Sequence, residues 1–303
     1  MKWMIIFKND ANELRAGWQI GVFILILATT SLLFIAPLVA VFNVRNQVAL
    51  STGLLVAALV ATWMVTRWVN RKPFVAVGLS VNAHTMKQLG IGCLLGWLMM
   101  TVIFGFQYVS DHVMVTAPDI SLVDGVQAFV GAALFFAVAA MSEEVLFRGY
   151  PFQTLVRGIG FIPSAVVMGV LFAAAHLMNP NASVFGFVNT FLVALLFSLA
   201  YWRTRSLWLP FGIHFAWNFS QTTLYGYPTS GVHFMEYELT RLTQFGPEWT
   251  TGGAYGPEGG ALATVTILVC GWYVYASGSL RPHPGAMTLE RETETIRWQM
   301  AER

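Results

Sequence analysis

Charged residues are scarce in this chain. They account for 11% of the 303 residues, whereas soluble globular domains carry about 25%. A soluble enzyme of this length needs a polar surface that 11% charged and 56% hydrophobic residues cannot provide. The shortage therefore excludes a soluble two-domain architecture, and we predict an all-α, polytopic membrane protein.

Two further shortages narrow the range of functions. The net charge is only +2, and no basic stripe interleaved with aromatic residues is present, so we expect no nucleic-acid partner. Cysteine occurs twice, at Cys93 and Cys270, and both positions lie in apolar segments. We expect packed thiols rather than a disulfide or a metal-binding pair.

Long apolar runs, by contrast, are abundant. A transmembrane helix needs about 20 predominantly apolar residues, with a range of roughly 17–25. Eight segments approach this length, so we predict about eight transmembrane helices around an intramembrane cavity, in a single domain over residues 1–280. The candidate spans are residues 17–42, 48–66, 89–109, 126–147, 163–178, 184–202, 207–225 and 260–278.

The distribution of basic residues predicts how the chain crosses the membrane. With eight spans and a cytoplasmic N-terminus, only Arg45 and Arg241 of the 17 Lys and Arg residues fall in outer loops. Basic loops tend to stay in the cytoplasm, so both termini are predicted to be cytoplasmic. Residues 281–303 change composition sharply and are predicted to be a cytoplasmic tail. The alternative is a partner-binding helix with Ile296 and Trp298 among its apolar contacts.

Two adjacent acids interrupt one of the apolar runs. Glu143 and Glu144 lie in the segment 126–147, and no other candidate span contains an acidic residue. An ionisable group at the depth of the bilayer costs about 2.5–3.5 kcal/mol on insertion scales. We therefore interpret the pair as a functional site. The alternative is a polar pair at the end of a helix, at the membrane interface.

Helical spacing predicts different roles for the two glutamates. Glu144 and Arg148 are four residues apart, on one face of a helix and within reach of an ion pair. A carboxylate held by a cation is a poor base. Glu143 points about 100° away and is left free for another helix. We therefore predict that Glu143 does the chemistry and that Glu144 and Arg148 give structural support.

Two other predicted spans each carry a histidine. His176 ends the sequence FAAAH, and His214 begins the sequence HFAWN, which ends at Asn218. His214 and Asn218 are four residues apart and share a helical face. Each histidine alone could be an interhelical hydrogen-bonding residue, and Asn218 alone is more often a polar contact between helices. What favours function is that these residues occur on separate spans together with the two glutamates.

A hairpin argument predicts the depth of these groups. If the fourth helix continues with a kink at Pro151, it meets the fifth helix in a turn at residues 158–160. Glu143 and His176 then lie at the same depth, because their midpoint, (143 + 176)/2 = 159.5, falls in that turn. His214 lies shallower by residue count, unless its helix begins deeper than the hairpin turn.

Other intramembrane chemistries lack their residues here. The chain has no HExxH sequence for a zinc protease helix and no aspartate inside a candidate span. The sequences present are EEVLFR (143–148), FAAAH (172–176) and HFAWN (214–218), which fit the patterns EExxxR, FxxxH and HxxxN. In these motifs the chain resembles the CPBP group of intramembrane proteases, which includes CAAX prenyl endopeptidases and bacterial relatives linked to bacteriocin immunity.

The resemblance implies a multi-helix membrane fold with an intramembrane catalytic cavity and a catalytic core at about residues 126–225. It implies that Glu143 and His176 activate water and that His214 and Asn218 stabilise the oxyanion. Two mechanisms fit. Glu143, His176 and His214 could hold a zinc ion with a fourth position open. Alternatively, Glu143 acts directly as the general base, with no cofactor required. Asn218 is a poor zinc ligand but a good oxyanion donor, which favours the second mechanism.

We therefore predict an intramembrane endopeptidase, of glutamate type or a metalloprotease, that works near the cytoplasmic half of the bilayer. Its expected partners are membrane lipid and a peptide or protein substrate that is membrane-anchored or, as the resemblance suggests, prenylated. The expected location is a bacterial inner membrane. Two alternatives stay open: a proton-coupled transporter that uses Glu143 as its proton site, and a non-catalytic immunity or binding protein.

Overall fold

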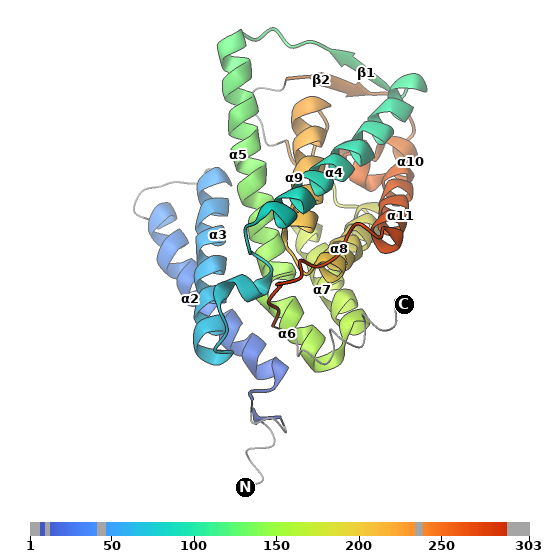
Figure 1. Cartoon of the computed structure of the whole chain (residues 1–303). Coiled ribbons are helices and arrows are strands. Elements are labelled where there is room, and N and C mark those ends of the chain that lie inside the picture. The colour runs from blue at the N-terminus through green and yellow to red at the C-terminus, as the bar shows by residue number, and fades with distance from the viewer. Residues whose placement is uncertain (1–6, 10–12, 41–46, 234–238, 290–303) are drawn as a thin grey trace.

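The computed structural model describes residues 7–9, 13–40, 47–233 and 239–289, and the structural statements below refer to these residues. They form a bundle of helices with a two-stranded β-ribbon at one end (Figure 1). Short 3₁₀ or π turns carry the label η. In chain order the elements are α2 (Ala16–Ala40), α3 (Gln47–Met64), η1 (Val65–Val69), η2 (Phe74–Val77), α4 (Ala83–Val109), β1 (Val113–Thr116), α5 (Leu122–Phe147), α6 (Tyr150–Ile159), α7 (Phe161–Ala175), η3 (His176–Met178), α8 (Val184–Thr204), α9 (Trp208–Phe219), η4 (Ser220–Leu224), β2 (Arg241–Gln244), α10 (Glu248–Thr251), η5 (Gly253–Tyr255), η6 (Pro257–Gly259) and α11 (Ala261–Ala276).

The predicted class, an all-α polytopic membrane protein, is confirmed. In the described part of the chain, six helices are long and apolar enough to cross a membrane. They are Ala16–Pro37, Gln47–Val69, Ala83–Val109, Leu122–Ile159, Phe161–Met178 and Val184–Thr204. The other two predicted spans correspond to shorter helices, namely α9 with its continuation η4, and α11, which has 16 residues.

The fourth helix, which we expected to continue beyond its span (126–147) to the turn at residues 158–160, is broken between α5 and α6. The break comes at Gly149, two residues before the kink expected at Pro151. A side chain is excluded there, because a Cβ on Gly149 would lie 2.2 Å from the carbonyl oxygen of Val145. Pro151 instead lies in the first turn of α6, where its missing N–H leaves no helical hydrogen bond unmade. The following turn is at Gly160, whose φ of +84° suits glycine.

Helices α4 and α9 pack backbone to backbone through glycines. A Cβ on Gly96 would lie 2.2 Å from the carbonyl oxygen of Ile213, and one on Gly212 would lie 2.6 Å from that of Leu89. Small residues permit this close approach between membrane helices. Gly96 is the midpoint of α4, since (83 + 109)/2 = 96. His214, next to Ile213, therefore lies beside the middle of α4, and its Nε2 is 3.7 Å from Oε2 of Glu143, so the two side chains are level in spite of the residue count.

The largest apolar core lies between α4, α8, α9 and α11. Its fully buried members include Ile103, Leu209 and Val274. Cys270 is a free thiol in this core, and Cys93 is a free, partly buried thiol on α4. The expectation of a thiol packed in the core is confirmed for Cys270.

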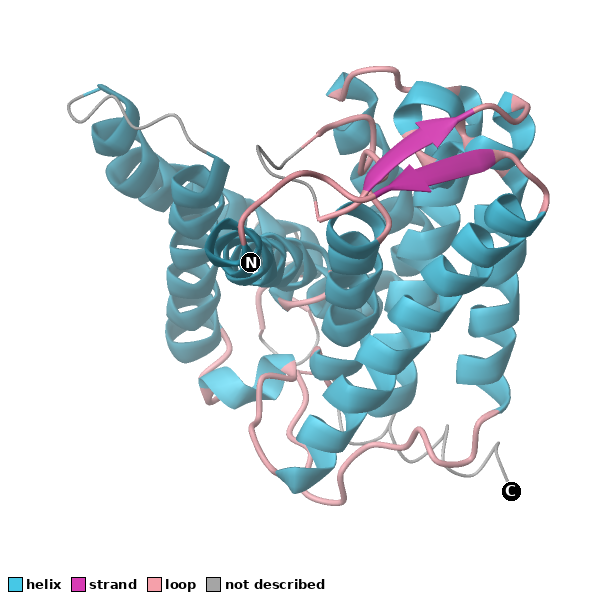
Figure 2. Ribbon diagram, turned by 90° about the horizontal axis from the view of Figure 1, so that it is seen from above, coloured by secondary structure: helices cyan, strands magenta, loops and turns pink. Residues whose placement is uncertain are grey.

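The β-ribbon lies at the end of the molecule away from the N-terminus (Figure 1). β1 and β2 are antiparallel, with Val113 opposite Gln244 and Thr116 opposite Arg241. Figure 2 shows the ribbon from above, across the ends of the helices. β2 belongs to the segment 226–260 between η4 and α11, which also contains α10, η5 and η6. This segment supplies one wall of the cavity described below.

The first residues of the predicted tail pack against the protein. Leu289 is buried, and Nζ of Lys72 donates a hydrogen bond to the carbonyl oxygen of Thr288 over 2.7 Å. Residues 290–303, on which the alternative of a partner-binding helix rests, lie outside the described residues, and so does Arg45.

Candidate active site

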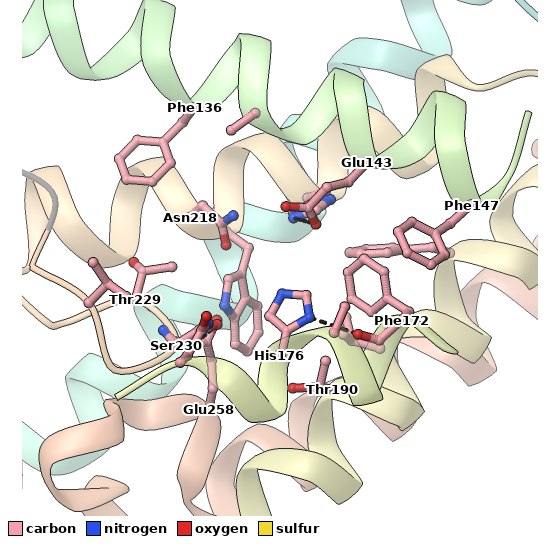
Figure 3. A pocket seen from close by; sticks show the side chains of 18 of the residues that line it. Phe136, Glu143, Phe147, Phe172, His176, Thr190, Asn218, Thr229, Ser230 and Glu258 are labelled. Atoms are coloured by element: carbon pink, nitrogen blue, oxygen red, sulfur yellow. Dashed lines mark hydrogen bonds and ion pairs between the residues drawn. The ribbon is translucent and has the colours of Figure 1, made fainter. Parts of the chain in front are cut away.

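A cavity of about 430 Å³ lies among α5, α7, α8 and α9 and the segment 226–260. The four residues predicted to be catalytic all line it: Glu143, His176, His214 and Asn218. Figure 3 shows Glu143 and His176 reaching into it from opposite walls, from α5 and from the end of α7. We call the part of the cavity around these four residues the motif end.

Glu144 lies at the centre of a buried chain of polar contacts. Nη1 of Arg148 donates a hydrogen bond to Oε1 of Glu144 over 3.4 Å. The same Oε1 accepts a hydrogen bond from Nδ1 of His214 over 2.8 Å. All three side chains are buried, with Glu144 at 0% exposure. The structure thus brings the predicted Glu144–Arg148 pair together and adds His214, which helical spacing could not reveal because it lies 70 residues away.

Aromatic rings enclose the charged end of Arg148. Its guanidinium carbon lies 4.5 Å from the ring centre of Phe172 and 5.0 Å from that of Phe197. Nη2 donates to the carbonyl oxygen of Ala194 over 3.2 Å. The ring of Phe197 also stacks on His214, with 4.9 Å between centres. Phe172 of the FAAAH motif and Phe197 of α8 therefore hold the cation and the imidazole in place through cation–π contact and packing.

The hydrogen bond to Glu144 fixes which nitrogen of His214 faces the cavity. A carboxylate oxygen accepts, so Nδ1 carries a hydrogen and Nε2 is turned toward Glu143. Nε2 lies 3.7 Å from Oε2 of Glu143. That oxygen is buried and has no hydrogen-bond partner in the described part of the chain, although the Glu143 side chain is 31% exposed. Of the two adjacent glutamates, Glu143 is therefore the one exposed to the cavity.

His176 is oriented by its own helix. Its Nδ1 lies 2.8 Å from the carbonyl oxygen of Phe172, one turn earlier. Because a carbonyl oxygen only accepts, Nδ1 is the donor, and in the neutral ring Nε2 is left as an acceptor. Asn218 follows His214 by one turn and reaches into the same cavity (Figure 3).

Residues 125–220 match the family model described as type II CAAX prenyl endopeptidase Rce1-like. The chain carries an Rce1-like domain. The matched segment covers 220 − 125 + 1 = 96 of the 303 residues and contains all three motifs. The predicted resemblance to the CPBP group is confirmed. None of the curated proteins compared with the chain matches it.

The donor set of the Rce1-like domain does not fit a three-ligand zinc site. Catalytic zinc takes three protein ligands at about 2.0–2.3 Å. Glu143 and His214 approach each other closely enough, at 3.7 Å, to share one ion. Within the described residues, however, no three His, Cys, Asp or Glu side chains form a group that could hold a metal ion. In this arrangement His176 does not join Glu143 and His214 in a common metal site.

The opposite part of the cavity was not predicted from the sequence. Thr229, Ser230 and Glu258 line it from the segment 226–260, outside the Rce1-like match, and we call this part the cap end. The backbone N and Oγ of Ser230 both donate to Oε2 of Glu258, the hydroxyl over 2.9 Å. Burial raises the pKa of Glu258, and the hydrogen bonds from Ser230 oppose that effect. The sequence signal was a glutamate in the glycine-rich stretch GPEGG, which is typical of an ordinary loop.

Proposed function

We propose that this protein is an intramembrane endopeptidase that hydrolyses a peptide bond with water activated by Glu143 and His176. The observation that carries the proposal is the convergence of the four motif residues on one cavity. The Rce1-like match supports the same class of reaction.

The attacking water is proposed to lie between Glu143 and His176. One of its hydrogens is directed to the carboxylate of Glu143, whose side chain is 31% exposed, and the other to Nε2 of His176. Glu143 takes the first proton as the water oxygen bonds to the peptide carbonyl carbon. The C–N bond then breaks, and Glu143 returns the proton to the leaving nitrogen. The products are a carboxyl group and an amine.

The tetrahedral intermediate carries a negative oxygen that needs hydrogen-bond donors. Asn218 offers its side-chain amide from one turn above His214. His214 has a carboxylate near each ring nitrogen, at 2.8 Å and 3.7 Å, and is proposed to carry a hydrogen on both nitrogens at this step. Its Nε2–H is then the second donor. Two such donors placed in advance are the arrangement that stabilises an oxyanion in acyl transfer.

Glu144 and Arg148 are proposed to act through His214. Glu144 fixes the orientation of the imidazole, and Arg148 compensates the charge of Glu144 in a buried environment. Neither side chain lines the cavity. They are therefore positioning residues rather than catalytic ones.

The walls of the cavity indicate the kind of substrate. Phe135, Phe136, Leu146 and Phe147 of α5 line it beside Glu143. An apolar cavity in a polytopic protein suits a membrane-anchored peptide or protein, and a prenylated chain is one member of that class. Which protein is cleaved is not specified by these residues.

The proposal is tested by comparing the membrane proteomes of cells that carry wild-type protein and Glu143→Ala protein at matched levels. We expect fragments with new termini in the wild-type cells alone. If both proteomes are identical while the purified wild-type protein shows proton-coupled flux that Glu143→Ala lacks, the protein is a transporter. If neither fragments nor flux are found, and binding of a partner survives Glu143→Ala, it is a non-catalytic binding protein.

A further inference from the structure

At the cap end of the cavity, the carboxylate of Glu258 is held by hydrogen bonds from a neighbouring turn. Two hydrogen bonds from Ser230 reach Oε2 of Glu258, one from the backbone N and one from the hydroxyl. The backbone of Glu258 is also fixed, because Nδ2 of Asn189 in α8 donates to its carbonyl oxygen over 2.8 Å. Figure 3 shows Glu258 and Ser230 together at the cavity wall, on the side away from Phe147 and Phe172.

The turn that carries Ser230 is locked by backbone contacts. The N–H of Gly231 donates to the carbonyl oxygen of Tyr255 over 2.8 Å. A Cβ on Gly231 would lie 1.9 Å from the carbonyl oxygen of Pro180, and its φ is +80°. Ser230 itself has a φ of +47°, which a non-glycine residue rarely adopts. The donors to Glu258 are therefore placed before any ligand arrives.

The carboxylate of Glu258 has no Lys or Arg beside it. In the described structure no Lys or Arg lines the cavity, and His176, when it is protonated, is the side chain that compensates Glu258. A half-buried carboxylate held by neutral donors is costly unless a cation compensates it. A neutral acceptor, such as the amide oxygen of a glutamine, would be enough to hold the Ser230 turn. The negative charge of Glu258 therefore indicates a second role beyond holding this turn.

We propose that Glu258, oriented by Ser230, is a subsite that binds a cationic group of the substrate, such as a lysine or arginine side chain or a primary amine. The subsite lies at the cap end of the same cavity, so a bound cation is connected to the bond at Glu143 through a short stretch of the same substrate. Proteases with a carboxylate in the specificity pocket select basic side chains on this principle. The inference deepens the proposed function, because it takes this cavity to be where the substrate binds.

Binding of two small amphiphiles tests the subsite without any cleavage. Octylamine and octan-1-ol have the same chain length and differ in charge, and their affinities are measured by thermal stabilisation of the purified full-length protein in detergent. For wild-type protein we expect octylamine to bind about tenfold or more tightly than octanol, as a charge-assisted hydrogen bond requires. Glu258→Gln keeps an acceptor for Ser230 but loses the charge, so the preference should disappear.

Two further variants control for folding and for general surface charge. Glu248→Gln makes the same acid-to-amide change at an exposed position of α10, outside the cavity, and should keep the preference for octylamine. Ser230→Ala removes the hydroxyl donor but leaves the backbone donor, so octylamine affinity should fall less than in Glu258→Gln. An equal affinity of wild-type protein for both amphiphiles, or a preference that survives in folded Glu258→Gln, overturns the proposal. If Glu258→Gln does not fold, unchanged octylamine affinity in Ser230→Ala overturns it.

A cleavage experiment separates this inference from the proposed function. A pool of apolar peptides that each contain one lysine, paired with norleucine counterparts, is incubated with the protein and the products are identified by mass spectrometry. Lysine peptides should be cleaved preferentially, and the preference should be lost in Glu258→Gln. Octylamine binding without any cleavage would support the cationic subsite and contradict the proposed protease activity. Cleavage without a lysine preference would support the protease activity and contradict the subsite.

Discussion

The two ends of the cavity are built in different ways. At the motif end the functional groups come from helices and are held by side-chain contacts, such as that of Glu144 with Arg148 and His214. At the cap end Glu258 comes from a 3₁₀ turn and is held by a loop whose backbone is pressed against its neighbours. Helix geometry converts sequence spacing into spatial placement, whereas a loop does not. The motif end could therefore be predicted from the sequence, whereas the cap end could not.

The ends also differ in how their carboxylates are treated. Glu144 is fully buried and is bonded to both a cation and an imidazole. Glu143 and Glu258 both face the cavity, and neither has a Lys or Arg partner in the described structure. The difference supports the proposed roles, in which Glu144 maintains the structure while the other two meet a ligand.

The largest expected effect is that of Glu143→Gln, which tests whether the motif end carries the chemistry. The amide keeps the shape of the side chain but cannot take a proton. Loss of a general base lowers the rate about 10²–10⁴-fold, and turnover should fall by at least this factor. The fold should be retained, as measured by thermal unfolding in detergent. Glu248→Gln is the matched control and should cleave like wild type. Wild-type activity in purified Glu143→Gln would remove Glu143 from the mechanism.

Next in size is the loss of stability on breaking the buried contacts of Glu144. Glu144→Ala leaves Arg148 without its carboxylate, and removing one partner of a buried ion pair costs about 3–5 kcal/mol. Arg148→Ala should show a similar loss, since it leaves the carboxylate uncompensated. Glu144→Gln still accepts from Nδ1 of His214 and should be milder than Glu144→Ala. Yield and thermal unfolding measure the effect, and a Glu144→Ala protein as stable as wild type yet inactive would contradict this assignment.

Removal of either oxyanion donor should have a smaller, purely catalytic effect. His214→Ala and Asn218→Ala should each lower the rate about 10²–10³-fold, because each removes one donor. Both proteins should bind the substrate and should contain no more metal than wild type. Stoichiometric zinc in active wild-type protein, lost with activity in both His176→Ala and His214→Ala, would instead establish a metal site.

Much of the motif end could be predicted because membrane helices constrain it. An acid inside an apolar run is expensive, so Glu143 and Glu144 were recognisable, and the i,i+4 spacing gave the contact with Arg148. The contact between Glu144 and His214 could not be derived, because it depends on how α5 packs on α9. The close packing of α9 on α4, which sets the depth of His214, was missed for the same reason.

The cap end could not be predicted from the sequence, for a different reason. Glu258 lies in a glycine-rich loop, and Ser230 lies 28 residues earlier in another turn. Their contact depends on positive φ angles at Ser230 and Gly231, which the sequence does not display as a pattern. The position of the break before α6 had a similar local cause, since Gly149 rather than Pro151 determines it.

The smallest expected effect concerns the stability contributed by Glu258 as pH changes. Burial raises the pKa of Glu258, so the folded protein holds this proton more tightly than the unfolded chain. The resulting stabilisation is complete below the ordinary carboxyl pKa and is lost as pH rises through the folded-state pKa. Glu258→Gln has no such group, so its melting temperature relative to wild type should rise as pH increases from about 4 to 8. The other titratable groups acting near Glu258, His176 and Tyr255, are the same in both proteins and largely cancel in the comparison. A difference in melting temperature that stays constant over this range would show that Glu258 titrates as it does in the unfolded chain, and the contrast between the two ends would then rest on geometry alone.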